Sequence, residues 1–352
     1  MGFRLTRIEF DKYLTNIAQA FEIYAPVRQK GKGAFSNTDV IGYGALSRFD
    51  EMVLDEKSYY SPKEIFYPIR ETLFYFLNNE MHEPEISQKP IILFLRPCDI
   101  NGIERLDTIF LKNGIEEDYY YLRRRKLLKI VMIECTEGFD SCFCVSMKAN
   151  RTNRYDAVMR IEDNDLKNET EIVFDTEDSD LLRGDLTDKK EEVLIPRFIE
   201  ENKVKVIIPD PNLVTSEMFN HALWTEYTNR CIACGRCNTS CITCSCFTMQ
   251  DVHVSSDVQV GDDKKSGERR RVWAGCHVEG YTNMAGGHSF RNKNGEKMRF
   301  KTMHKVNDFY KRFGMHMCVG CGRCDDVCPE YISFSKCINK LNQIVQEGQT
   351  HE

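Results

Sequence analysis

The chain has 352 residues, enough for two compact domains, because single hydrophobic cores usually stop growing near about 250–300 residues. Hydrophobic residues make up 41% and charged residues 29%, which is the composition of a globular protein rather than a disordered or fibrous one. The net charge of −6 provides no positive field for collecting phosphates, so nucleic acid is not expected as a partner.

The amino terminus predicts the compartment. Charged side chains interrupt MGFRLTRIEFDKYL, where a signal peptide would need an unbroken apolar stretch, and no later run reaches the roughly 18 apolar residues of a membrane span. We therefore expect a cytoplasmic protein that does not bind a membrane. In a reducing cytosol its 16 cysteines should hold metal as thiolates and should not form disulfides.

Hydrophobic periodicity predicts an α/β structure for the first part of the chain. Apolar residues at helical spacing predict helices over residues 10–21 and 61–77, the second one capped by Ser61. The apolar runs PIILFL (90–95) and LLKIVMI (127–133) predict buried strands. A cysteine follows each of these two strands closely.

Weaker signals follow in the polar stretch beyond residue 160. The pattern predicts a strand around IVF (172–174), a helix in VLIPRFIEEN (193–202) and a strand in VKVIIP (204–209). A Pro-containing linker then leads into a helix starting near Ser216, and a later helix is expected over 302–312.

The distribution of cysteines divides the chain, since four lie before residue 230 and twelve lie after it. We place a domain boundary near residue 212. The predicted fold is an α/β (α+β) domain over 1–212, a mainly α-helical two-cluster ferredoxin-like domain over 213–340, and a polar tail over 341–352.

Two cysteine runs carry the strongest chemical signal. CIACGRCNTSC and CVGCGRCDDVCP both have the spacing C-x2-C-x2-C-x3-C, the signature of two-cluster ferredoxins. In those proteins the fourth cysteine of each run binds the other cluster, so we predict two [4Fe-4S] clusters with crossed ligand sets. Structural zinc, the alternative, needs only four ligands. The predicted sets are Cys231, Cys234, Cys237 with Cys328, and Cys318, Cys321, Cys324 with Cys241.

Four cysteines near the predicted strand ends suggest a third site. If the two strands are neighbours, the thiols converge on one edge of the sheet, where α/β folds place their sites. We predict a third [4Fe-4S] cluster there; a zinc site with the same thiols and simple packing are the alternatives. The predicted ligands are Cys98, Cys135, Cys142 and Cys144.

The remaining polar and thiol residues have plainer interpretations. Packing is the default for Cys244, Cys246, Cys276 and Cys337, with Cys276 the best candidate for a function because it lies beside a Gly-rich stretch. Histidines and an arginine near it could orient a thiolate, although structural roles are more common. These are His277, His288 and Arg291. Of two basic runs, 123–126 is interpreted as surface and 269–271 as a docking site.

Several stretches together resemble the iron-sulfur A-type component of anaerobic sulfite reductases and, more broadly, the iron-sulfur β subunits of cytoplasmic sulfhydrogenases. The resemblance covers nearly the whole chain, and its most specific motifs are SCFC, RRVWAGC and MAGGHSFR beside the two cysteine runs. It implies an electron relay from an NADH-oxidising flavoprotein B subunit to a siroheme C subunit, which reduces sulfite to sulfide. The same role in a cytoplasmic hydrogenase or sulfhydrogenase is the alternative.

The sequence lacks the common motifs for nucleotide binding and catalysis, which is consistent with a chain that only transfers electrons. The glycine pairs at 31–33 and 42–44 lack the third glycine of a dinucleotide-binding turn, so neither NAD nor flavin is expected on this chain. No nucleophile elbow, P-loop or zinc-protease helix occurs, and we name no catalytic residue. A zinc-stabilised scaffold without redox function is the alternative of another class.

Overall fold

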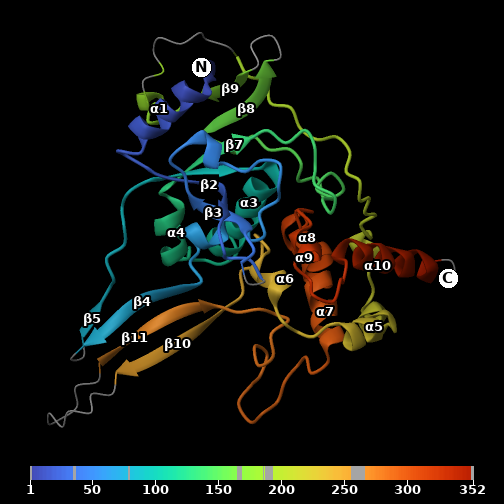
Figure 1. Ribbon diagram of the computed structural model, residues 1–352. Helices are drawn as coiled ribbons and strands as arrows, with labels where there is room; N and C mark the ends of the chain where they lie inside the picture. Colours follow the sequence, from blue (N-terminus) through green and yellow to red (C-terminus); the bar gives the residue numbers. More distant parts are fainter. Residues whose placement is uncertain are drawn as a thin grey trace.

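A seven-stranded mixed sheet organises the N-terminal part of the protein (Figure 1). The computed structural model describes residues 2–34, 37–77, 80–164, 169–184, 186, 193–254 and 266–349. The inner strands β8, β7, β6 and β2 pair in parallel, and the outer pairs are antiparallel. The strand order is β1 (Gly2–Thr6), β9 (Glu169–Thr176), β8 (Ala157–Asn164), β7 (Leu128–Ile133), β6 (Ile91–Leu95), β2 (Glu22–Gln29) and β3 (Val40–Ala45).

Successive side chains of the central strands point to opposite faces of the sheet, where they pack in two hydrophobic cores. In β6, Ile92 and Phe94 pack in the core beneath helix α1 (Arg7–Ile17), whereas Leu93 and Leu95 pack in the core on the other face. That second core also holds side chains of α3 (Pro97–Leu111) and α4 (Tyr119–Arg125). The helix predicted over 10–21 is confirmed as α1, and the strands predicted near 90–95, 127–133 and 172–174 are confirmed as β6, β7 and β9.

A second, four-stranded sheet projects from the main body (Figure 1) and corrects one prediction. Its order is β10 (Phe247–Val254), β11 (Ser266–Trp273), β4 (Arg70–Leu77) and β5 (Glu80–His82). The helix predicted over 61–77 is wrong: α2 covers only Lys63–Phe66, and β4 follows. Pro68 disfavours helical backbone at the residue before it, and pairing with β11 then makes the segment extended. The Ser61 hydroxyl has no hydrogen-bond partner, so it caps nothing.

The segment 193–209 contains neither the predicted helix nor the predicted strand. It runs as irregular chain past the end of β7, where Phe198 forms an isolated bridge with Cys135. Pro196 cannot donate the hydrogen bond that a helix interior requires. The Ile199 amide bonds instead to the loop that carries Cys135, and a local pattern cannot reveal such a partner.

Helices provide most of the regular structure in the C-terminal part, as predicted. Residues 294–313 are helical throughout, which confirms the helix expected over 302–312. The helices are α5 (Leu223–Arg230), α6 (Arg236–Thr239), α7 (Asn294–Met303), a π-helical turn (His304–Asp308), α8 (Phe309–Phe313), α9 (Arg323–Asp326) and α10 (Phe334–Gln349). The β10–β11 hairpin lies between α6 and α7. Short 3-10 turns cover Phe49–Glu51, Leu181–Gly184, Pro211–Leu213 and Ser216–Asn220.

The two predicted domains pack on one another. Leu93 and Phe143 of the N-terminal part lie in the same hydrophobic core as Val319 and Ile338 of the C-terminal part. The fold class is therefore confirmed, a mixed α/β part followed by a helical one, while the boundary at 212 stays a prediction. Among the described helices, none combines the length and hydropathy that crossing a bilayer demands.

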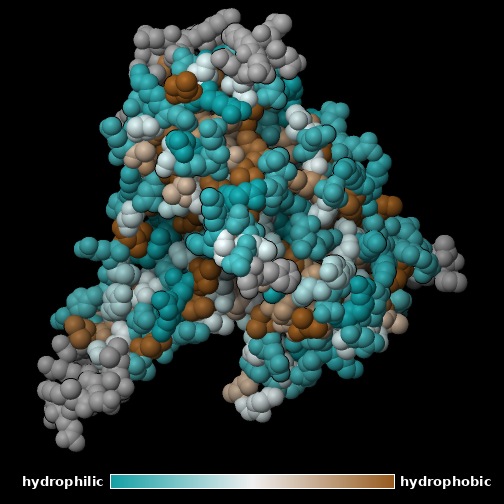
Figure 2. Space-filling model, viewed as in Figure 1, coloured by the Kyte–Doolittle hydropathy of each residue, from teal (hydrophilic) through white to brown (hydrophobic). Residues whose placement is uncertain are grey.

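The visible surface is mostly hydrophilic, with scattered hydrophobic side chains (Figure 2). The small sheet carries several of them, since Leu77, Met81 and Met249 are each half exposed or more.

Candidate iron-sulfur sites

The two cysteine runs fold into matching loops. Each ends in a glycine with positive φ, Gly235 at 75° and Gly322 at 73°, immediately before a one-turn helix. This left-handed backbone is favourable for glycine and costly for larger residues. In both loops the backbone amide two residues after the first cysteine lies 3.4 Å from the Sγ of that cysteine, Cys231 or Cys318. Amide donors of this kind stabilise a metal-bound sulfur.

Cys328 lies with the first run, although it belongs to the second in sequence. Burial raises the pKa of Cys231, and the nearby thiols of Cys237, Cys234 and Cys328 raise it further. These four cysteines line one cavity of about 40 Å³, together with Cys324 and His277. The arrangement supports the crossed ligand set predicted for the first cluster.

Cys241 correspondingly lies with the second run. Burial raises the pKa of Cys318 to about 12, with Cys241 and Cys321 among the contributing neighbours. Cys241 also interacts with Cys321, and Cys324 interacts with both Cys318 and Cys321. The four thiols predicted for the second cluster are therefore neighbours in the fold.

The four N-terminal thiols converge on one edge of the large sheet. β6 and β7 are parallel neighbours, so Cys98 at the start of α3 and Cys135 after β7 lie at the same edge. Burial raises the pKa of Cys144 to about 12, and the thiols of Cys142 and Cys135 contribute. Cys98 interacts with Cys144 and with Cys321. The thiols predicted for the third site therefore lie beside those predicted for the second.

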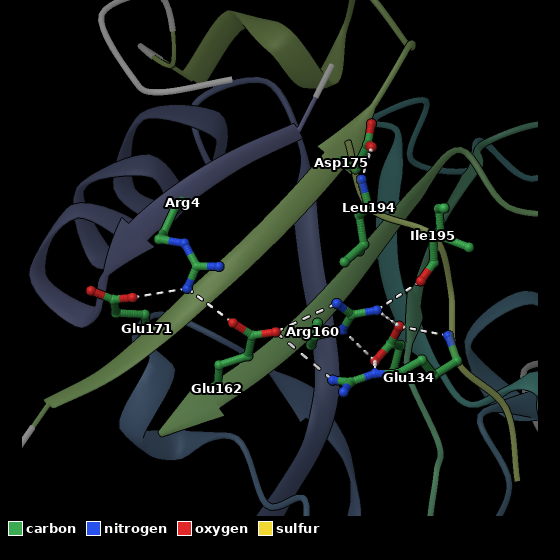
Figure 3. Close-up of polar contacts among 9 residues, drawn as sticks. Arg4, Glu134, Arg160, Glu162, Glu171, Asp175, Leu194 and Ile195 are labelled. Atoms are coloured by element: carbon green, nitrogen blue, oxygen red, sulfur yellow. Dashed lines mark hydrogen bonds and ion pairs between the residues drawn. The ribbon is translucent and has the colours of Figure 1, made fainter. Parts of the chain in front are cut away.

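A charged network fixes the strand end before Cys135 (Figure 3). Glu134 accepts two hydrogen bonds from the Arg160 guanidinium, at 2.6 and 2.7 Å, and one from the backbone amide of Arg197 at 2.7 Å. Burial would raise the pKa of Glu134, but these donors hold it below its usual value. Next in the chain, the Cys135 carbonyl accepts from the Ile199 amide at 2.7 Å. The irregular segment therefore holds the Cys135 loop in place.

The N-terminal cysteine loop packs directly on the second run. The Phe143 amide donates to the Gly320 carbonyl at 2.8 Å, and the Cys142 Sγ lies 3.6 Å from the Cys321 carbonyl. A Cβ at Gly320 would lie 2.5 Å from the Phe143 carbonyl oxygen, so only glycine allows this approach. The loops of the predicted second and third sites are therefore in direct contact.

A buried ion pair joins the same two sites. Arg323, between Cys321 and Cys324, donates to both carboxylate oxygens of Asp99 at 2.5 and 2.8 Å, and Asp99 follows Cys98. Both side chains are almost fully buried, at 3% and 0% exposure. Bidentate pairs of this kind fix orientation as well as charge.

Two buried lysines that no sequence motif singled out line the cluster region. Lys301 and Lys305 lie one turn apart on the α7 and π-helical segment, each 3% exposed. Burial would lower the pKa of Lys301, but the thiols of Cys237, Cys324 and Cys244 hold it well above its usual range. Lys305 Nζ lies 3.5 Å from the Cys241 Sγ. Their i, i+4 spacing, at the start of the helix predicted over 302–312, was the available signal.

The other residues singled out in the sequence lie in different places. His277 lines the first cavity with its Nε2 unpartnered, and burial lowers its pKa to about 3. His288 is exposed, and Arg291 stacks on Phe300 at 3.6 Å. The docking prediction for 269–271 is wrong for Arg271, which is 3% exposed and pairs with Glu71.

The donor set suits iron-sulfur clusters. It consists of thiols in C-x2-C-x2-C loops, with amide donors to sulfur and buried cations that balance thiolate charge. Among the described residues, no three His, Cys, Asp or Glu side chains are grouped closely enough to hold a single metal ion.

Comparison with known proteins agrees with this chemistry. Residues 230–332 match the family model of a 4Fe-4S dicluster domain. The chain is also 28% identical to sulfhydrogenase 2 subunit beta of Pyrococcus furiosus, over 95% of this chain and 96% of that protein. The chain is a distant homologue of that protein. The dicluster domain spans both cysteine runs and supports two [4Fe-4S] clusters.

Proposed function

We propose that the chain is the electron-transfer component of a sulfhydrogenase-type oxidoreductase complex in the cytoplasm. The observation that carries the proposal is the continuity of the thiol sites. Cys321 interacts with Cys98 of the N-terminal group and with Cys241 of its own group, and Cys324 lines the cavity of the first group. Three clusters held there would form a row through the protein.

When bound, the clusters supply one-electron chemistry at potentials that charge, hydrogen bonds and burial adjust. The chain holds the sulfurs in place and buries those of Cys142, Cys144, Cys318 and Cys321, whereas Cys234 is exposed. Backbone amides donate to Cys231 and Cys318, and Lys301 and Lys305 place positive charge where an added electron would be stabilised.

The identity of the partners is a finer part of the proposal. The name of the homologue favours a sulfhydrogenase-type complex over the sulfite reductase expected from the motif resemblance. In the sulfite reductase alternative, the partners would be an NADH-oxidising flavoprotein B subunit and a siroheme C subunit. We propose no flavin, NAD or membrane site on this chain in either case.

Purification of the native complex under anaerobic conditions tests the proposal. We expect nickel and hydrogen uptake to accompany the chain, together with iron and acid-labile sulfide in equal amounts. A siroheme absorption band without nickel would support the sulfite reductase alternative instead. Zinc without labile sulfide would refute the relay and would favour the zinc-stabilised scaffold. Zinc bound only at the N-terminal thiols would refute the third cluster.

A further inference from the structure

Three cysteines outside the predicted cluster sites surround a separate cavity. Cys244, Cys246 and Cys276 line a space of about 270 Å³, many times the roughly 10–15 Å³ that one water molecule needs. Cys337 does not line it, because its thiol is buried against Thr302 at 3.5 Å. The rest of the wall includes Tyr281, Phe300, Lys301, His304 and Lys305.

The register of the small sheet brings these thiols together. β10 and β11 pair from Phe247 opposite Trp273, so the residues just outside that pair meet at the base of the hairpin. Cys246 immediately precedes β10, and its carbonyl accepts from the Ala274 amide at 2.9 Å, two residues before Cys276. Cys244 lies on the same approach to β10. Strand pairing between segments about 30 residues apart therefore brings Cys246 and Cys276 to the same end of the hairpin.

One buried amide contacts two of the sulfurs. Asn238, in α6 and 2% exposed, has its Nδ2 3.5 Å from the Cys244 Sγ and 3.3 Å from the Cys276 Sγ. A side chain that donates to two thiols at once is typical of the outer shell that orients metal ligands. Asn238 follows Cys237, so the cavity lies next to the first predicted cluster.

The charge around the cavity suits an anionic occupant, in addition to the thiolates that Lys301 and Lys305 already face. Lys301 and Lys305 line it, and Lys63 Nζ donates to the Cys244 carbonyl at 2.8 Å. All three lysines are at most 3% exposed, and no salt bridge of the described residues pairs any of them with a carboxylate. Buried cations are costly unless a negative group compensates them. A thiolate-ligated iron-sulfur cluster is such a group.

We propose that Cys244, Cys246 and Cys276 hold a further [4Fe-4S] cluster whose fourth iron has a ligand other than cysteine. Tyr281 and His304 line the same cavity and carry the oxygen and nitrogen atoms suited to that iron. The site goes beyond the relay proposed above, which needs only the other three sites.

Iron and labile sulfide analysis of the anaerobically purified full chain tests the site. Cys276→Ser and, separately, Cys246→Ser should each lower iron and sulfide by about four per chain while the ferredoxin-type EPR signals persist. Cys337→Ser, a buried thiol outside the cavity, is the matched control and should lose none. Far-UV circular dichroism shows whether each variant folds. If one of the two cavity variants does not fold, the other still tests the site.

The outcomes separate this site from the relay. Iron in both cavity variants equal to that of Cys337→Ser would overturn the site and leave the relay intact. Absence of iron and sulfide in the unmodified chain would overturn both. Cys244 lies close to Cys241, so it could instead belong to the second-run cluster. If Cys244→Ser loses the EPR signal of that cluster while Cys276→Ser loses no iron, Cys244 belongs to it and the proposed site is overturned.

A second measurement addresses the non-cysteine ligand. Ferricyanide accepts one electron as one ferrous ion leaves a [4Fe-4S]2+ core, giving [3Fe-4S]+, and an iron without a thiolate ligand leaves most readily. The unmodified chain should therefore give a three-iron EPR signal after brief oxidation, and Cys276→Ser should not. Equal signals in the two proteins would contradict non-cysteine ligation.

Discussion

Individual buried charges set the environment of the proposed clusters. Lys305 contacts the Cys241 sulfur and the Thr243 hydroxyl, the latter at 2.8 Å, from a position closed to solvent. Arg323 is held between Asp99 and the Ser58 carbonyl, beside Cys321 and Cys324. Positive charge next to thiolate sulfur favours the reduced, more negative state of a cluster. These two residues should therefore affect potential more than they affect ligation.

Replacing Lys305 by Met should lower the reduction potential of the second-run cluster. The substitution keeps the length of the side chain and removes a buried positive charge near Cys241. We expect a fall on the order of 59 mV, a tenfold change in a one-electron equilibrium, in an EPR-monitored redox titration. Lys311→Met, on the exposed surface of α8, should leave the potential unchanged. Equal potentials in all three proteins would contradict the role given to Lys305.

The crossed ligand sets predict which cluster a single cysteine supports. Cys328→Ala should remove or convert the cluster bound by the Cys231 run, because Cys328 lines that cavity. The EPR signal of the cluster at Cys318 should persist. Damage restricted to the Cys318 run would show that each run serves its own cluster.

At the scale of elements, the small sheet depends on one buried carboxylate. Glu71 in β4, 4% exposed, accepts from Arg124 at 2.8 Å and from Arg123 and Arg271 at 3.0 Å each. It therefore ties β4 to α4 and β11. Burial would raise the pKa of Glu71, but Arg124 and Arg123 hold it below its usual value.

Glu71→Gln should lower the free energy of unfolding by about 3 kcal/mol at pH 7, because it removes the carboxylate that Arg123, Arg124 and Arg271 share. The loss is at the lower end for a broken buried ion pair, since the buried Arg271 keeps Asp118 as a partner. The pKa of Glu71 is lower in the folded state, so its contribution is present above the unfolded value of 4.5 and declines as the pH falls below it. Anaerobic calorimetry from pH 7 to pH 4 should show the two proteins converging.

The exposed pair on the same hairpin provides a control for this measurement. Asp251→Asn breaks a solvent-exposed ion pair with Arg269 and should lower the free energy of unfolding far less than Glu71→Gln does. A loss in Glu71→Gln no larger than that in Asp251→Asn would show that the buried network does not stabilise the sheet.

The loop at Gly320 makes a second prediction for an element. Gly320→Ala would strain a backbone at φ 66° and would place a Cβ against the Phe143 carbonyl, so it should cost about 2–4 kcal/mol. Gly314→Ala has a similar φ of 71° but no atom within 4 Å, and should cost only about 1–2 kcal/mol. Thermal midpoints measured under anaerobic conditions compare them. Equal midpoints would mean that the Phe143 loop can move away.

The sequence predicted best what depends on near neighbours in the chain. The strands β6 and β7 and the glycine turns at 235 and 322 follow from local patterns, and all of them are present. The helix predicted over 61–77 failed because β4 is extended by a partner almost 200 residues away. The buried lysines Lys301, in α7, and Lys305, in the π-helical turn, were missed because their partners are thiols of other segments. Contacts of this kind are not encoded in any short stretch.

At the scale of the whole molecule, the proposed third site connects the α/β part to the helical part. Cys98→Ala should lower iron by about four per chain, because Cys98 is one of its four predicted ligands. The paired signals of the two ferredoxin-type clusters should persist, since Asp99 and Arg323 remain in place. Unchanged iron content in Cys98→Ala would contradict the third cluster. Loss of all EPR signals would mean that Cys98 also supports the second-run cluster.

The pairing of β4 with β11 has a consequence for biosynthesis. Residues 70–77 leave the ribosome long before 266–273, and at about 5–20 residues per second the delay is roughly 10–40 s. During that time β4 lacks its β11 neighbour, and the N-terminal thiols lack the Gly320 loop that later covers them. A nascent chain in this state is prone to aggregation. Loading of iron and sulfide into the third site should therefore follow release of the full-length polypeptide.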